Sequence, residues 1–476
     1  MIMSNLQMPI KTVPYRHQEK AFEFVMNRFE NPGGVALLVE MGCGKTLISI
    51  AVSGALFKEG KIKRLLIVCP LSICGVWKEE FSRFADFDYR LEVLKGTPNK
   101  KAETLTLMNG SSLQVAVVNY ESVWRLEEQV KDWNPDMIIC DESHKIKTHN
   151  IAASKSLHRL GEKTKYKMIL TGTVITNKAI DVFSQYKFLD SNIFGKSFYV
   201  FRNRYFDMVG YGNHTPVLKK GAEDELKRKL HSIAFRATKS ECLDLPETTE
   251  IVRKIHLEPS AMNTYRRLVR DSFAELKNSE VTATNILTKI LRLSQLTGGF
   301  LGDDEGKKVH QVSSAKLKAL EDIIDDVTES GKKLVVMARF ISEIKAIEKL
   351  LLKKKINYSI VTGGIRNRSE QIEKFQNESD VLIFVGQIAT AGLGITLTAS
   401  STMVFYSLDY SMSNFEQAKA RIHRTGQKEN CTYIYLIASN TVDEKILKIL
   451  REKADLAKTL IDDYISGRNP YEIGGF

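Results

Sequence analysis

The chain has 476 residues, which is too long for one ordinary domain and suits two or three. Hydrophobic residues make up 43% and charged residues 26%, a globular composition that argues against long disordered tracts. The formal net charge of +12 points to a polyanionic partner, most simply nucleic acid, although many basic proteins bind none.

The chain shows no feature of a secreted, zinc-binding or membrane-spanning protein. Its six cysteines form no CxxC pair and no zinc-binding spacing, and several lie in apolar runs, which predicts buried free thiols in a reducing compartment. The N-terminus lacks an apolar signal core, and no apolar run reaches the length of about 18 residues that spans a bilayer. We therefore expect a soluble, intracellular protein.

Apolar runs alternate with helical patterns through the first half of the chain. The runs lack polar alternation, which is typical of parallel strands covered on both faces. The expected strands are 35–39, 64–69, 113–118, 137–140 and 167–170, with helices at 15–29, 46–57 and 76–84. This order predicts an open parallel α/β sheet.

The second half repeats the alternation. The expected strands are 333–337, 358–361, 380–384, 402–406 and 432–437, with helices at 342–353 and 414–423. Between the halves, 191–240 is rich in Lys, Arg, Phe and Tyr, an extended crossing segment begins at 243–246, and 260–297 indicates a helical pair. We predict a first lobe at 1–240 with a helical insertion from about 191, a linker with helical insertion at 241–310, and a second lobe at 311–476.

A glycine-rich turn follows the first expected strand and leads into a helix. Gly42, Cys43, Gly44, Lys45 and Thr46 read GxGKT, the ending of a phosphate-binding loop (P-loop). The glycines let backbone N–H groups approach phosphate oxygens, and the helix N-terminus favours negative charge. We expect Lys45 to reach the β- and γ-phosphates of ATP and Thr46 to ligate Mg²⁺.

Two acids end the strand at 137–140. We expect Asp141 to hold Mg²⁺, mostly through water, and Glu142 to orient the water that attacks the γ-phosphate. Such a pair alone often marks only a turn, but after a P-loop it is the expected partner. Upstream, the amide of Gln18 both donates and accepts hydrogen bonds, which suits the edge of adenine. Taken alone, Gln18 would be a surface helix residue.

Two further signals lie in the second half. Arg421 and Arg424 are three residues apart, so on a helix they share one face, where arginines can neutralise charge that develops on a γ-phosphate. Two helical arginines usually form only a solvated basic face. Gly392 and Gly394 permit a tight loop that presents N–H groups to a phosphate of ATP or of nucleic acid, and we expect Gly394 to contact the nucleotide.

In this order the motifs resemble those of the Swi/Snf-type ATPases of helicase superfamily two, over nearly the whole chain. The most discriminating segment is QAKARIHRTGQ at 417–427, which is close to that family's QAxxRxHRxGQ signature. The other matching segments are YRHQ (15–18), MGCGKT (41–46), CPLSICGVWKEEF (69–81), VVNYESV (117–123), DESH (141–144), ILTGT (169–173), VVMARF (335–340) and ATAGLGITLT (389–398).

The resemblance implies two RecA-like parallel-sheet lobes, with short helical insertions between them and ATP between the lobes. It implies catalytic roles for Lys45, Asp141 and Glu142 on the first lobe, and arginine fingers at Arg421 and Arg424 on the second. The implied activity is ATP hydrolysis coupled to lobe opening and closing, which drives translocation on double-stranded DNA. The chain is short for the family, so we expect a compact member of bacterial or viral type, cytoplasmic in a bacterial cell.

The chain departs from the family pattern at a few positions. Val174 follows Thr173 where the family usually has proline, in a motif that couples the ATP and nucleic-acid sites. Residues 411–413 are Ser-Met-Ser where Trp-Asn-Pro is frequent, and Cys43 replaces a frequent leucine. None of these changes removes a catalytic group.

Contacts to DNA should be mostly to phosphates, without sequence specificity, because no groove-reading module is visible. Trp77 borders one expected contact loop, but packing in the core is the favoured interpretation for it. Arg366 and Arg368 are as well explained by a solvated loop as by a phosphate contact. The stretch 198–206 either contacts DNA or packs on the first lobe. The candidate contacts are Ser72, Asn119, Tyr120, Thr362, Gly363, Arg366 and Arg368.

Three functions remain open from the sequence. The leading one is a DNA-dependent ATPase that translocates on duplex DNA. The first alternative is a helicase that separates or anneals strands at forks or branches, which depends on a small wedge element that sequence does not reveal. The second alternative is a nucleotide-gated nucleic-acid-binding protein, which the intact catalytic set argues against.

Overall fold

A computed structural model describes residues 7–172, 178–209, 215–242, 245–278, 283–302, 309–364, 367–391 and 395–457. The chain forms two compact units. We call Met1–Asp244 with Lys453–Phe476 the first lobe and Leu245–Glu452 the second lobe. Among the described residues, no helix combines the length and the apolar character needed to cross a membrane.

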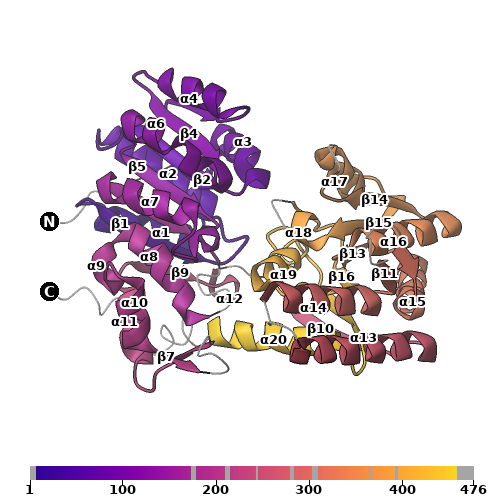
Figure 1. The fold of residues 1–476 in the computed structure, drawn as a ribbon. Helices are drawn as coiled ribbons and strands as arrows, with labels where there is room; N and C mark the ends of the chain where they lie inside the picture. Colours follow the sequence, from indigo (N-terminus) through magenta and orange to yellow (C-terminus); the bar gives the residue numbers. More distant parts are fainter. Residues whose placement is uncertain are drawn as a thin grey trace. The chain divides into compact units, whose positions relative to one another are not determined.

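The first lobe is built on a seven-stranded parallel sheet (Figure 1). The strand order is β3 (Tyr89–Val93), β4 (Leu113–Asn119), β2 (Arg64–Cys69), β5 (Met137–Asp141), β6 (Tyr166–Leu170), β1 (Gly33–Val39) and β9 (Ala234–Ala237). Because all strands run in one direction, their carboxyl ends meet at one edge of the sheet. The loops that follow β1, β2, β4 and β5 therefore gather at that edge.

Apolar cores cover both faces of this sheet, as the unbroken apolar strands predict. One core includes Val35 and Leu37, and the other includes Ala36 and Leu38, so successive residues of β1 point to opposite faces. The first face carries α1 (Arg16–Arg28), α2 (Lys45–Lys58) and α3 (Cys74–Phe84). The second carries α4 (Pro98–Thr106), α6 (Glu127–Trp133), α7 (Ala152–Lys163), α8 (Val182–Leu189), α10 (Phe198–Tyr205) and α11 (Glu223–His231).

Short elements complete the first lobe. They are α5 (Tyr120–Val123), α9 (Ser191–Phe194), the antiparallel hairpin of β7 (Phe206–Val209) and β8 (Thr215–Leu218), and α12 (Lys239–Cys242). The region from 191 thus holds the expected helices, and it also supplies β9 to the sheet.

The second lobe holds a six-stranded parallel sheet. Its order is β10 (Thr248–Ile255), β17 (Cys431–Ala438), β16 (Thr402–Phe405), β13 (Leu334–Ala338), β15 (Val381–Gln387) and β14 (Asn357–Val361). Residues of α15 (Ala315–Glu329) and α16 (Ile341–Lys354) fill the core on one face. On the other face, α17 (Arg368–Asn377) packs Phe375 against Phe384 of β15, and α19 (Met412–Lys419) packs Phe415 against Phe405 of β16, with the rings tilted in both pairs.

The remaining second-lobe elements include the helical pair that the sequence predicts. These elements are α13 (Pro259–Asn278), α14 (Ala283–Thr297), the antiparallel β11 (Phe300–Gly302) and β12 (Val309–Gln311), α18 (Ile388–Ala391) and residues 442–452 of α20 (Val442–Ala457). The helices α13 and α14 lie side by side (Figure 1).

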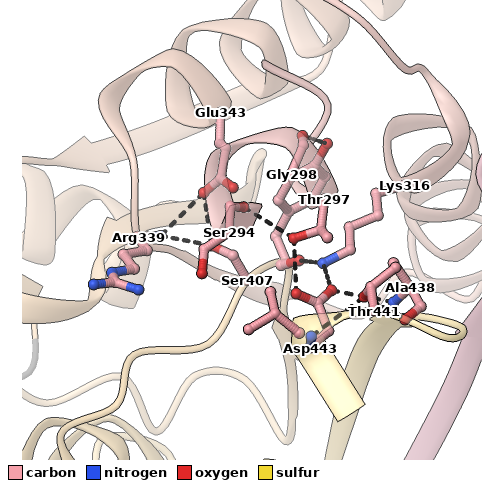
Figure 2. A network of polar contacts seen from close by, with 12 residues as sticks. Ser294, Thr297, Gly298, Lys316, Arg339, Glu343, Ser407, Ala438, Thr441 and Asp443 are labelled. Atoms are coloured by element: carbon pink, nitrogen blue, oxygen red, sulfur yellow. Dashed lines mark hydrogen bonds and ion pairs between the residues drawn. The ribbon is translucent and has the colours of Figure 1, made fainter. Parts of the chain in front are cut away.

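A buried polar network ties these elements together (Figure 2). The Nζ atom of Lys316, a residue that is only 2% exposed, lies 2.6 Å from Asp443 Oδ2 and 3.1 Å from Tyr406 O. Thr297 donates a 2.7 Å hydrogen bond to Asp443 Oδ1. Nearby, Glu343 Oε2 accepts from the Ser407 hydroxyl at 2.6 Å. The network joins α14, α15, α16 and α20 to the ends of β16 and β17.

The ten strands expected from the sequence are all present. The sequence does not predict the edge strands β3, β9 and β10 of the two parallel sheets, nor the two-stranded sheets β7–β8 and β11–β12. In β10 most residues are exposed and its sequence contains no apolar run, so the sequence predicts only an extended crossing segment here.

The helix expected at 414–423 was wrong at its C-terminal end. The helix α19 ends at Lys419, so neither Arg421 nor Arg424 lies on it. Arg421 Nε donates to the Gln417 carbonyl at 2.9 Å, which satisfies a carbonyl of the last helical turn and ends the helix.

Candidate nucleotide-binding site

The P-loop joins β1 to α2 with two left-handed glycines. Gly42 has φ 89° and Gly44 has φ 84°, and Gly44 caps the N-terminus of α2. The backbone angle requires glycine at Gly44, and a Cβ atom there would also displace the Gln18 side-chain amide. The first N–H groups of α2 have no partner one turn earlier, which suits a phosphate. Thr46 lies half-buried in that first turn.

Lys45 bends back onto the strand that leads into the loop. Its Nζ atom donates a 2.8 Å hydrogen bond to the Val39 carbonyl. The ammonium group therefore lies at the carboxyl edge of the sheet, where it also lowers the pKa of Asp141.

Two side chains of α1 hydrogen-bond to the backbone of the P-loop. His17 Nε2 lies 2.8 Å from the Cys43 carbonyl and donates to it, and Gln18 Nε2 donates to the same oxygen at 3.4 Å. Gln18 Oε1 accepts from the Tyr15 N–H at 2.9 Å. Gln18 is thus buried against the loop rather than on a helix surface, and its contact with adenine stays a prediction.

The acidic pair follows β5 at the same edge. Trp77 Nε1 donates to Asp141 Oδ2 at 3.1 Å, and the Glu142 N–H donates to Asp141 Oδ1 at 2.9 Å. The Tyr120 hydroxyl donates to the Asp141 carbonyl at 2.8 Å. Burial, followed by the charge of Glu142, raises the pKa of Asp141 to about 7, although Lys45 and Trp77 oppose the rise.

Glu142 adopts a left-handed conformation with φ 52° and ψ 52°, which is uncommon for a residue with a side chain. Its Oε2 atom lies 3.3 Å from His144 Nδ1. Left-handed non-glycine residues are often found at functional sites, where surrounding structure holds them.

The donor set fits a hard divalent cation. Mg²⁺ prefers carboxylate and hydroxyl oxygens, and Asp141 and Thr46 supply such oxygens at one edge of the sheet. A bound cation would favour the ionised form of Asp141, whose protonation is otherwise favoured by burial and by Glu142.

In the second lobe both predicted arginines bind one backbone oxygen. Arg421 Nη1 and Arg424 Nη1 donate to the Ile395 carbonyl at 3.1 and 3.2 Å. Gln427 Nε2 donates to the carbonyls of Ser400 and Ile422, at 2.9 and 3.1 Å. The arginines therefore lie in a turn that is tied to the loop at 395–400. Gly392 and Gly394 lie outside the described residues.

The structure separates the predicted DNA-contact residues into buried and exposed ones. Asn119 and Tyr120 are buried. Asn119 donates to Glu121 Oε2 at 2.9 Å, and the Tyr120 hydroxyl donates to the Asp141 carbonyl. Ser72 lies exposed in the 3₁₀ turn Leu71–Ile73.

On the second lobe, Gly363 is exposed and its N–H donates to Gln387 Oε1, while Thr362 is half-buried. Arg368 is half-buried at the start of α17, and burial lowers its pKa. Arg366 lies outside the described residues, as do Thr173 and Val174 of the motif that departs from the family pattern.

The basic, aromatic stretch 198–206 divides its side chains between core and surface. Phe201 and Tyr205 are buried in the first lobe, whereas Tyr199 is exposed, with the Arg202 guanidinium 5.3 Å from its ring centroid. Packing on the first lobe is therefore confirmed for part of this stretch.

The sequence does not identify two residues, Trp77 and Gln427, whose side chains hold these sites together. Trp77 was expected in the core, which is confirmed, but its bond to Asp141 joins residues 64 positions apart and no local pattern indicates it. From the sequence, Gln427 stands out only as part of the signature at 417–427. Its side chain also accepts from the N–H groups of Lys428 and Glu429, so one amide organises the whole turn.

Comparisons with known proteins agree with the motifs. A family model of the SNF2-related domain matches residues 17–298, more than half of the chain, and one of the helicase conserved C-terminal domain matches 315–426. The DNA repair and recombination protein RDH54 of Saccharomyces cerevisiae is 26% identical over 92% of this chain and 52% of its own length. The RAD54-like DNA repair and recombination protein of Drosophila persimilis is 25% identical, over 97% and 64%.

Among solved structures, the Sulfolobus solfataricus SWI2/SNF2 ATPase core in complex with dsDNA is 27% identical, covering 99% of this chain and 98% of that one, with a TM-score of 0.45. The chain spans between half and two thirds of the length of the two curated relatives. The family match over more than half of the residues is decisive: the chain belongs to the SNF2-related family of ATPases.

Proposed function

We propose that this chain hydrolyses ATP and uses the energy to translocate on double-stranded DNA without sequence specificity. The observation that carries the proposal is the meeting of the P-loop and the acidic pair at one sheet edge, where Lys45 is near enough to lower the pKa of Asp141. Membership of the SNF2-related family and the net charge of +12 support DNA as the polyanionic partner.

In the proposed site each residue has one task. The N–H groups of the P-loop and the Lys45 ammonium bind the phosphates, and Thr46 with Asp141 would hold Mg²⁺. When bound, that ion would neutralise charge on the phosphate oxygens. Glu142 orients the attacking water and accepts its proton. Arg421 and Arg424 stabilise charge on the γ-phosphate in the transition state.

The first test is ATP hydrolysis measured with duplex, single-stranded and forked DNA and with RNA. Greatest stimulation by duplex DNA supports the proposal. Lys45→Ala and Glu142→Gln should both abolish turnover, but Glu142→Gln should keep ATP binding because it removes charge and little volume. Wild-type turnover in either variant would contradict the assigned roles.

A strand-displacement assay separates translocation from unwinding. Release of a labelled strand from a partial duplex would replace translocation with a helicase. If the purified chain bound ATP and DNA but showed no DNA-stimulated phosphate release at any salt concentration, a nucleotide-gated binding protein would be the better description.

A further inference from the structure

Two thiols face each other beside the acidic pair. Cys69 ends β2 and Cys74 begins α3, and their Sγ atoms lie 3.4 Å apart. Cys74 Sγ also donates to the Pro70 carbonyl at 3.6 Å, so the Cys69 thiol is the donor between the two sulfur atoms. A disulfide has a length of about 2.05 Å, so bond formation requires the sulfurs to approach by only about 1.4 Å.

The segment between the cysteines connects two parts of the proposed machinery. Leu71 is 72% exposed and Ser72, a candidate DNA contact, is exposed beside it. On the first turn of α3, Trp77 binds Asp141. The cysteines are therefore the two ends of a short loop, with its tip at the surface and its base next to the acidic pair.

We propose that Cys69 and Cys74 are a site of reversible oxidative modification, at which hydrogen peroxide forms a disulfide that closes the loop at 70–73. The Cys74 thiolate attacks one peroxide oxygen, the O–O bond breaks, and a sulfenic acid and hydroxide form. The Cys69 sulfur then attacks the Cys74 sulfur, the S–S bond forms, and the hydroxyl leaves as water. Two thiols lose two electrons, and one peroxide becomes two waters.

The environment favours Cys74 as the attacking group. The hydrogen bond from Cys69 lowers the pKa of Cys74, because the thiolate accepts that bond. Cys74 is 5% exposed and Cys69 is fully buried, so the reaction should be slow and should begin at Cys74.

The functional consequence rests on the proposed function. A loop fixed at both ends loses the freedom to fit the DNA backbone, so DNA stimulation of ATP hydrolysis should fall toward the DNA-free rate. ATP binding should persist, because the P-loop follows a different strand. Reduction with dithiothreitol should restore stimulation.

The decisive experiment is mass spectrometry of the full chain after peroxide treatment and alkylation of free thiols. Trypsin cleaves after Arg64 and Lys78, so both cysteines fall in one peptide, 65–78. We expect this peptide to escape alkylation and to be lighter by two hydrogen atoms, and to become alkylated after reduction. This readout does not depend on ATPase activity, so it separates failure of this proposal from failure of the proposed function.

Matched variants complete the test. Cys74→Ser keeps a donor for the Pro70 carbonyl and should make DNA stimulation resistant to peroxide. Cys431→Ser, which changes a buried cysteine of the second lobe, should leave the sensitivity unchanged. Full alkylation of peptide 65–78 after oxidation, gain of oxygen without a disulfide, or a link only between the neighbouring Cys43 and Cys242 would overturn the proposal.

Discussion

The hydrogen bond from Trp77 to Asp141 predicts a measurable shift in the pH dependence of ATP hydrolysis. Trp77→Phe keeps most of the buried ring but removes the N–H group that donates to Oδ2. A hydrogen bond to a charged group contributes about 1.5–3 kcal/mol, and one pKa unit corresponds to about 1.4 kcal/mol. The pKa of Asp141, already raised to about 7, should therefore rise by about one to two further units in the free protein.

The sign of the effect follows from the ion that the carboxylate is proposed to hold. A proton and Mg²⁺ compete for Asp141, so a higher pKa weakens Mg²⁺ binding on the acid side. The acidic limb of the ATPase pH profile should move to higher pH, most strongly at limiting Mg²⁺. At saturating Mg²⁺ and alkaline pH the variant should approach the wild-type rate.

The assay is the steady-state ATPase rate across a pH series at two Mg²⁺ concentrations. Trp133→Phe is the matched control, because Trp133 is also buried in the first lobe and its N–H donates to the Met108 carbonyl, away from Asp141. An acidic limb that does not move in Trp77→Phe, or that moves equally in Trp133→Phe, would refute the reasoning.

Three other changes test the second lobe. Burial raises the pKa of Glu343 from 4.5 to about 7, so the protonated carboxyl stabilises the folded state below pH 4.5, and this stabilisation is lost as the pH rises toward 7. Glu343→Gln should flatten the pH dependence of the free energy of unfolding measured in urea. An unchanged pH dependence would contradict the prediction. Asp443→Ala leaves the buried Lys316 ammonium without its carboxylate and should lower the free energy of unfolding by about 3–5 kcal/mol, whereas a loss below about 1 kcal/mol would argue against a buried pair. Arg424→Ala should lower kcat far more than it raises the Kd for ATP, and equal effects would assign Arg424 to ground-state binding.

The sequence predicts most of the sheets because their strands are apolar on both faces. Residues 65–69 of β2 and 137–140 of β5 form unbroken apolar runs, which are typical of a parallel sheet covered on both faces. By contrast, β3 buries only Leu91 and β10 exposes most of its residues, so neither strand carries the apolar run that marks a covered strand.

The P-loop and the acidic pair were predictable because each is local in sequence. Two of the hydrogen-bond partners of Asp141, Trp77 and Tyr120, come from other elements, and their contacts depend on how those elements pack. The end of α19 was mispredicted for the same reason. Helical periodicity continues past Lys419, but the Arg421 side chain binds the backbone at Gln417 and Ile395, which no short-range pattern encodes.

The shared bond to the Ile395 carbonyl makes the two arginines interdependent. One oxygen accepts from both guanidinium groups, so a rotation of the single peptide that carries it changes the hydrogen bonding of both side chains at once. Substitutions at Arg421 and Arg424 should then be non-additive, since removing one leaves the full acceptor capacity of that oxygen to the other. The orientation of the one peptide unit that carries the Ile395 carbonyl thus controls the positions of both guanidinium groups.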